Sequence, residues 1–61
     1  MKAETPEAQQ RDSDTIFLQI TSAFDSIEDA KAAIVLFYVP DPSFSRAGIC
    51  HALKRLEKYY P

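Results

Sequence analysis

The sequence predicts an all-α fold in the form of a helical hairpin. Three observations lead to this prediction. Apolar residues recur from Ile16 to Phe37 with alternating spacings of four and three, prolines interrupt the chain at positions 40 and 42, and a second amphipathic stretch follows. The expected elements are a long helix over about 14–38, a turn over 39–43 and a second helix over about 44–60.

The chain is too short to bury a large core. It has 61 residues and a formal net charge of −2, and domains of this size usually need a disulfide, a metal or a partner chain for stability. Cys50 and His51 are the only cysteine and histidine in the sequence, which leaves no internal disulfide and no four-ligand zinc site. We therefore expect no cofactor or metal, and either a homodimer or a protein partner.

Residues 1–13 form a polar segment that includes Pro6 and has no aromatic residue. This composition is typical of chain that does not fold by itself. The sequence therefore predicts a mobile N-terminal tail over 1–13, followed by a single small helical domain over 14–61.

The long helix is expected to present one continuous apolar seam. Ser13 or Asp12 can cap its start, and Asp14 suits the positive end of the helix dipole. Alternation of four and three is the coiled-coil period, so the seam is predicted to pair two chains. The seam contains Ile16, Ile20, Ala23, Ile27, Ala30, Ile34 and Phe37, and the dimer contacts are assigned to Ile16, Ile20, Ile27, Ile34 and Phe37.

Two other interpretations of this region remain open. The stretch from Asp25 to Glu28 has a capping-box pattern, which indicates a new helix start there and hence two shorter helices. Alternatively, Thr15–Ile20 and Ile34–Val39 are strands, because a short apolar run cannot be assigned by periodicity alone.

The second helix is expected to follow a proline turn. Pro40 disfavours helix at Val39, and Asp41 and Pro42 suit the cap and first position of a new helix. Gly48 inside this helix indicates close approach of another backbone. Its apolar residues are Ile49, Ala52, Leu53, Leu56, Tyr59 and Tyr60, and its basic face contains Arg46, His51, Lys54, Arg55 and Lys58.

The chain has more aromatic and aliphatic side chains than one hairpin can bury. An apolar surplus of this kind usually marks an interface. Either two hairpins pack as a four-helix bundle, or a partner protein covers the surface. The residues assigned to partner binding are Phe17, Phe24, Tyr38, Phe44 and Tyr60.

The segment Ser45–Lys58 supports a second interpretation. Ser45-Arg46, Ile49 and the run Leu53–Glu57 resemble the recognition helix of winged-helix regulators of the multiple-antibiotic-resistance type. The resemblance covers about a quarter of the chain and implies a DNA-binding helix-turn-helix with Arg46, Ala47, Cys50 and Lys54 toward the groove. The proline-rich turn before this segment departs from the family pattern.

Catalysis is not expected. Cys50 and His51 are adjacent and point about 100° apart on a helix, which does not suit a thiolate–imidazole pair. The longest apolar run is too short to span a membrane, and a single cysteine without an export signal favours the cytoplasm. The leading hypothesis is a non-enzymatic protein–protein interaction module, such as an inhibitor, adaptor or regulatory subunit. A DNA-binding regulator is the alternative.

Overall fold

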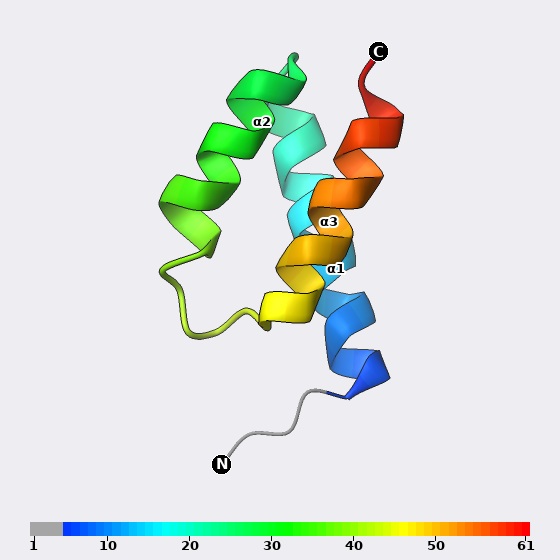
Figure 1. The fold of residues 1–61 in the computed structure, drawn as a ribbon, viewed down its shortest axis with the longest axis vertical. Helices are drawn as coiled ribbons and strands as arrows, with labels where there is room; N and C mark the ends of the chain where they lie inside the picture. Colours follow the sequence, from blue (N-terminus) through cyan, green and yellow to red (C-terminus); the bar gives the residue numbers. More distant parts are fainter. Residues whose placement is uncertain (1–4) are drawn as a thin grey trace.

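The computed structural model describes residues 5–61, and this part of the chain is all-helical and contains no strand. Its elements are α1 (Pro6–Ala23), α2 (Ile27–Ala33), the π-helical segment η1 (Ile34–Tyr38) and α3 (Arg46–Tyr59). Helices α1 and α3 run in the same direction. The segment formed by α2 and η1, which connects them along the chain, runs in the opposite direction (Figure 1). The main packing is between α1 and α3.

Helix α1 begins at Pro6, eight residues before the predicted start. Thr5 caps it by accepting a hydrogen bond from the Ala8 N–H at 3.1 Å, and Pro6 occupies the first turn, where its missing N–H is not needed. Asp12 and Ser13 are buried. The helix start predicted at residue 14 is therefore wrong. Of the predicted tail, residues 1–4 lie outside the described part of the chain.

The predicted long helix over 14–38 is divided in the structure. Phe24 adopts extended backbone, with φ of −127° and ψ of 143°, and α2 starts after Ser26. The Ser26 hydroxyl caps α2 by accepting a hydrogen bond from the Asp29 N–H at 3.2 Å. Two shorter helices meeting near Asp25 are thus what the structure contains, and both segments proposed as strands are helical. Residues 5–61 therefore contain three α-helices and the π-helical segment η1 in place of the predicted two-helix hairpin.

The segment η1 changes which side chains face the core. The Val39 N–H donates to the Ile34 carbonyl oxygen at 3.0 Å, five residues back, so this turn is wider than an α-helical turn. A wider turn holds more residues, and the next inward position after Ile34 falls on Tyr38 instead of Phe37. Phe37 is consequently exposed, although the periodicity placed it in the seam.

Helix α3 starts later than predicted. Ser45, not Asp41, is its cap, and the Ser45 hydroxyl accepts from the Gly48 N–H at 3.0 Å. Asp41 instead accepts from the Ser43 N–H at 2.8 Å, within the turn. The Ser45 N–H donates to the buried Asp12 carboxylate at 2.8 Å, which fixes the start of α3 against α1.

Gly48 allows the close contact between α1 and α3, as the sequence predicted. A Cβ atom at position 48 would lie 2.6 Å from the Asp12 Cβ and 3.2 Å from the Gln9 carbonyl oxygen. No larger residue fits there without moving backbone. The core that these helices enclose consists of Ile16, Ile20, Ala30, Ala33, Ile34, Ile49, Ala52, Leu56 and Tyr60.

Candidate protein-binding surface

Four large exposed apolar side chains lie close together in the sequence, three in η1 and one at the residue that follows it. Val35, Leu36, Phe37 and Val39 are 61%, 67%, 62% and 54% exposed. Lys31, Ala32, Val35, Leu36 and Pro40 line one shallow hollow, so these residues are also contiguous in space. We call the set Ala32, Val35, Leu36 and Pro40 the α2–η1 apolar face; Phe37 and Val39 are exposed on the same short segment but do not line this hollow.

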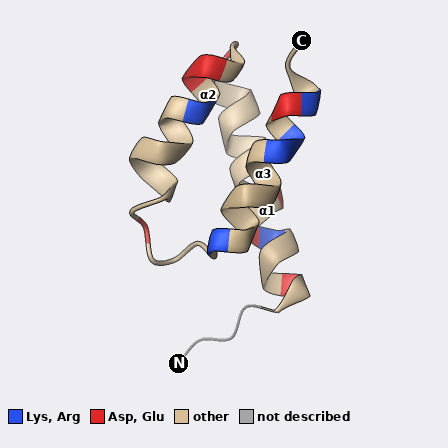
Figure 2. Cartoon of the chain, in the orientation of Figure 1, with Lys and Arg blue, Asp and Glu red and all other residues tan. Residues whose placement is uncertain are grey.

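Charged residues lie at the two ends of this face and not in its middle. Figure 2 shows acidic residues at the start of α2, a basic residue after them, an uncharged stretch through η1, and an acidic residue in the following turn. These are Glu28, Asp29, Lys31 and Asp41, and the nine residues from Ala32 to Pro40 contain no charge. Lys31 contacts Glu57 of α3 at 3.4 Å, in a pair whose side chains are about half exposed.

The aromatic residues predicted to bind a partner also take part in the chain's own packing. Tyr38 stacks edge to face on Phe44, with ring centroids 4.9 Å apart, and its hydroxyl donates to the Gln19 side-chain oxygen. The Tyr60 hydroxyl donates to the Phe24 carbonyl oxygen at 2.7 Å, which ties the end of α3 to the α1–α2 junction. Burial raises the pKa of both tyrosines, and Tyr59 and Asp25 add to the rise at Tyr60.

Phe17, the fifth of these aromatics, belongs to a cluster on one side of the α1–α3 contact. Its ring meets Tyr59 edge to face at 5.4 Å between centroids, and the Arg55 guanidinium lies 4.4 Å from the Phe17 ring centroid. Phe17 is half-buried in this arrangement. The cluster therefore holds helices together within one chain.

The residues assigned to the dimer seam separate into core and surface. Ile16, Ile20 and Ile34 are buried within the single chain, and Ile27 is half-buried against the same core. Phe37 is exposed on η1, next to the α2–η1 apolar face in the sequence. Pairing of two chains through the isoleucines would require this core to open, whereas Phe37 is accessible without any rearrangement.

The predicted basic face is only partly a free surface. Arg46, His51, Lys54 and Lys58 are exposed on α3. Arg55 turns toward α1, where it donates to the Asp14 carboxylate at 2.6 Å and to the Ser13 hydroxyl at 3.1 Å. The hydrogen bond from Arg55, followed by one from Gln10, lowers the pKa of Asp14. Arg55 thus serves the fold.

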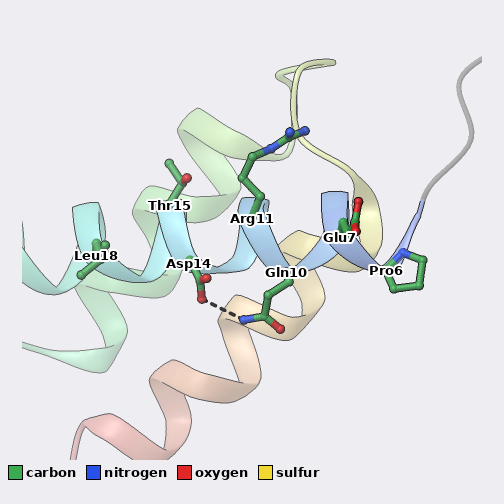
Figure 3. Close-up of a pocket in the computed structure, with 7 residues that line it drawn as sticks. All are labelled: Pro6, Glu7, Gln10, Arg11, Asp14, Thr15 and Leu18. Atoms are coloured by element: carbon green, nitrogen blue, oxygen red, sulfur yellow. Dashed lines mark hydrogen bonds between the residues drawn. The ribbon is translucent and has the colours of Figure 1, made fainter.

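Two other hollows carry polar groups. One is a shallow surface on α1, shown in Figure 3, where Gln10 and Asp14 are hydrogen-bonded to each other between Pro6 and Leu18. The other lies beside the turn and exposes Cys50 and Arg46 over Val39, Phe44 and Leu53. His51 is exposed, and residues 5–61 contain no group of three or more side chains suited to hold a metal ion.

The sequence interpretation expected an exposed apolar surplus, but its list of partner-binding residues did not include the centre of the exposed surface. It assigned Phe37 to the seam and did not assign Leu36, Val39 or Pro40 to any site. The available signal was the uncharged run from Ala32 to Pro40, which is too short for a membrane span and too long for one buried helix face. Such a run has apolar residues on every side, so some of them must remain exposed.

The comparisons with known proteins supply no relative. No family model matches the chain, and neither curated proteins nor solved structures give a match. Within residues 5–61, none of the helices combines the length and apolar character that crossing a membrane requires.

Proposed function

We propose that the chain is a non-enzymatic protein–protein interaction module that binds another protein chain through the α2–η1 apolar face. The observation that carries this proposal is the exposure of Val35, Leu36, Phe37 and Val39 on one short segment. Large contiguous apolar patches on small domains usually mark interaction sites. Roles as an inhibitor, an adaptor or a regulatory subunit all require such a surface.

The packing behind the face supports this proposal. Tyr38 and Phe44 stack beneath η1, and the Tyr38 hydroxyl is hydrogen-bonded to α1. Side chains on a well-held backbone lose less conformational entropy on binding, which favours affinity. In this proposal Tyr38 and Phe44 support the surface, and the exposed aliphatic residues and Phe37 make the contact.

A pair of matched variants tests the proposal. Leu36→Asp places a charge at the centre of the face, and Leu18→Asp places one on the outer face of α1, where Leu18 is 64% exposed. Cell extract from the native host is passed over the immobilised wild type and both variants. Partners that remain on wild type and Leu18→Asp but not on Leu36→Asp support the proposal. Equal retention on the wild type and both variants contradicts it.

The same experiment separates protein binding from the DNA-binding alternative. Nuclease treatment removes partners that are held through nucleic acid, and a titration with mixed DNA fragments at two salt concentrations measures direct binding. If the proposal is correct, the chain does not show the kind of DNA binding that weakens steeply as the salt concentration rises. Salt-sensitive binding that is lost in Lys54→Ala, with Leu36→Asp unaffected, would instead support a DNA-binding regulator acting through α3.

A further inference from the structure

The π turn of η1 decides which of two neighbouring aromatic residues faces the core. We infer that this turn is one state of a two-state register switch. In the observed register Tyr38 packs inward and Phe37 is exposed, and closing the π turn to an α turn exchanges the two rings. The switch is a property of the free chain and does not rest on the proposed function, but it determines which ring a partner meets.

The backbone hydrogen bonds change register at Ile34. Its N–H is shared between the carbonyl oxygens of Ala30 and Lys31, four and three residues back. The Val39 N–H instead reaches five residues back, to the Ile34 carbonyl oxygen at 3.0 Å. Moving the Val39 N–H to the Val35 carbonyl oxygen, four residues back, would close an α turn and keep this N–H bonded. The two registers therefore differ by a local shift and not by unfolding.

Helix geometry gives the consequence for the two aromatic rings. At about 100° per residue, the position three residues after Ile34 lies between the directions of Ala30 and Ala33. Both alanines are buried, so an α turn would direct Phe37 into the core. The wider π turn moves this inward direction on by one residue, and Tyr38 is accordingly half-buried while Phe37 is 62% exposed. The apolar spacing of the sequence thus describes one register, and the structure shows the other.

Each register has a stabilising contact that the other lacks. In the π register the Tyr38 ring meets Phe44 edge to face at 4.9 Å between centroids, and the Tyr38 hydroxyl donates to the Gln19 side-chain oxygen. In the α register the Phe37 ring would leave water and the Tyr38 hydroxyl would return to it. One aromatic pair with one exposed hydrogen bond contributes about as much as burial of part of a phenyl ring. The two registers are therefore close in free energy.

The turn after η1 can absorb a shift of one residue. Residues 39–45 contain no helix, and the Asp41 N–H donates to the Tyr38 carbonyl oxygen at 3.1 Å within this stretch. The start of α3 is fixed separately, because the Ser45 N–H donates to the Asp12 carboxylate at 2.8 Å. The rearrangement can therefore end before α3 and leave the contact between α1 and α3 unchanged.

A double-mutant cycle on the two rings tests the switch. Phe37→Gln leaves the π register intact, and Tyr38→Gln is partly rescued because Phe37 can turn inward. The double variant has no aromatic ring for the inward position in either register. Urea unfolding should therefore show that its folding equilibrium constant falls at least tenfold further than the two single effects combined.

Leu36 provides the matched control for this cycle. It points outward in both registers and is 67% exposed in the structure. The effects of Leu36→Gln and Tyr38→Gln should therefore combine additively, to within about twofold in the folding equilibrium constant. If Phe37→Gln and Tyr38→Gln are equally additive, Phe37 never enters the core and the inference is overturned.

Amide NMR spectra of the free chain provide an independent measurement. Gln19→Ala removes the acceptor of the Tyr38 hydroxyl and should raise the α-register population roughly threefold, whereas Phe37→Gln should lower it. The Val39 and Asp41 resonances should then move in opposite directions in the two variants, or a second set of peaks should grow in one and shrink in the other. Relaxation dispersion covers exchange at rates between these limits. Shifts confined to the neighbours of each substitution overturn the switch.

Both measurements use the free chain, so their outcome is separate from that of the proposed function. If the cycle is additive but Leu36→Asp still loses host partners, the switch fails and the proposed function stands. If the cycle is strongly non-additive but Leu36→Asp retains every partner, the switch stands and the proposed function fails.

Discussion

The α1–α3 contact and the α2–η1 segment use similar residues for different purposes. Between α1 and α3, aliphatic side chains are fully buried, a glycine allows backbone approach, and Asp12 and Arg55 make hydrogen bonds across the contact. Along η1, aliphatic side chains of the same types are mostly exposed, with uncharged neighbours. The difference shows that hydrophobicity alone does not define the core. The core is also defined by which side of each helix faces its neighbour and by the hydrogen bonds that side chains make between helices.

The largest expected difference between the two regions is the cost of deleting a leucine side chain. Leu56 is fully buried and Leu36 is 67% exposed. Leu56→Ala should lower the free energy of unfolding by about 2–5 kcal/mol because it leaves a cavity. Leu36→Ala should change it by no more than about 0.5 kcal/mol. Urea unfolding at concentrations too low for association measures both, and equal losses would contradict the division.

The next largest effect should come from Gly48, where the backbones of α1 and α3 are closest. In an exposed helix, Gly→Ala would stabilise by about 1 kcal/mol. Here the new methyl group would lie 2.6 Å from the Asp12 Cβ, so Gly48→Ala should instead destabilise by about 1–3 kcal/mol. Thermal unfolding followed by circular dichroism measures the change. A higher melting temperature would show that the contact is looser than described.

The hydrogen bond from the Ser45 N–H to Asp12 should contribute somewhat less. Asp12→Ala leaves this partly buried N–H without its acceptor and should cost about 1–3 kcal/mol. Asp12→Asn retains an acceptor oxygen and nearly the same side-chain volume and should cost less, so the pair of variants separates loss of the charge from loss of the acceptor group. Equal losses from both variants would mean that the charge of Asp12, and not its position, fixes the start of α3.

The sequence was sufficient for the fold class and for much of the core. Six of the seven residues at the predicted seam spacing lie in α1 or α2 or start η1, and Ile16, Ile20, Ala30 and Ile34 are buried. The role of Gly48 was also predicted correctly. These features depend on the spacing of apolar residues and on the small size of one residue, and both can be taken directly from the sequence.

The errors arose where two local signals competed. Pro6 was interpreted as part of a tail, although a preceding Thr5 makes proline a good first helical residue. The break at Phe24–Ser26 was outweighed by the continuous seam, and the π turn at Ile34–Tyr38 shifted the seam's last member to the surface. A π turn has no sequence signature, so the exposure of Phe37 could not be predicted from periodicity.

The smallest expected effect is the pH dependence of the unfolding free energy that comes from Asp14. This residue makes the more exposed of the polar contacts between α1 and α3. Hydrogen bonds from Arg55 and then Gln10 lower the pKa of Asp14 in the folded chain. The unfolded chain therefore binds a proton at a higher pH than the folded chain, and this contribution to stability is present above the ordinary aspartate pKa and is lost as the pH falls below it. Asp14→Asn should flatten the acid limb of a plot of unfolding free energy against pH. Arg55→Met should flatten it more than Gln10→Ala, following the order of the two hydrogen bonds. Because the Asp14 side chain is about half exposed, added salt should shrink the difference between wild type and Asp14→Asn. If the acid limbs of wild type and Asp14→Asn instead run parallel, the ion pair between Asp14 and Arg55 adds no more to stability than contact of the two groups with water. The buried contacts of α1 and α3 would then suffice to hold the two helices together.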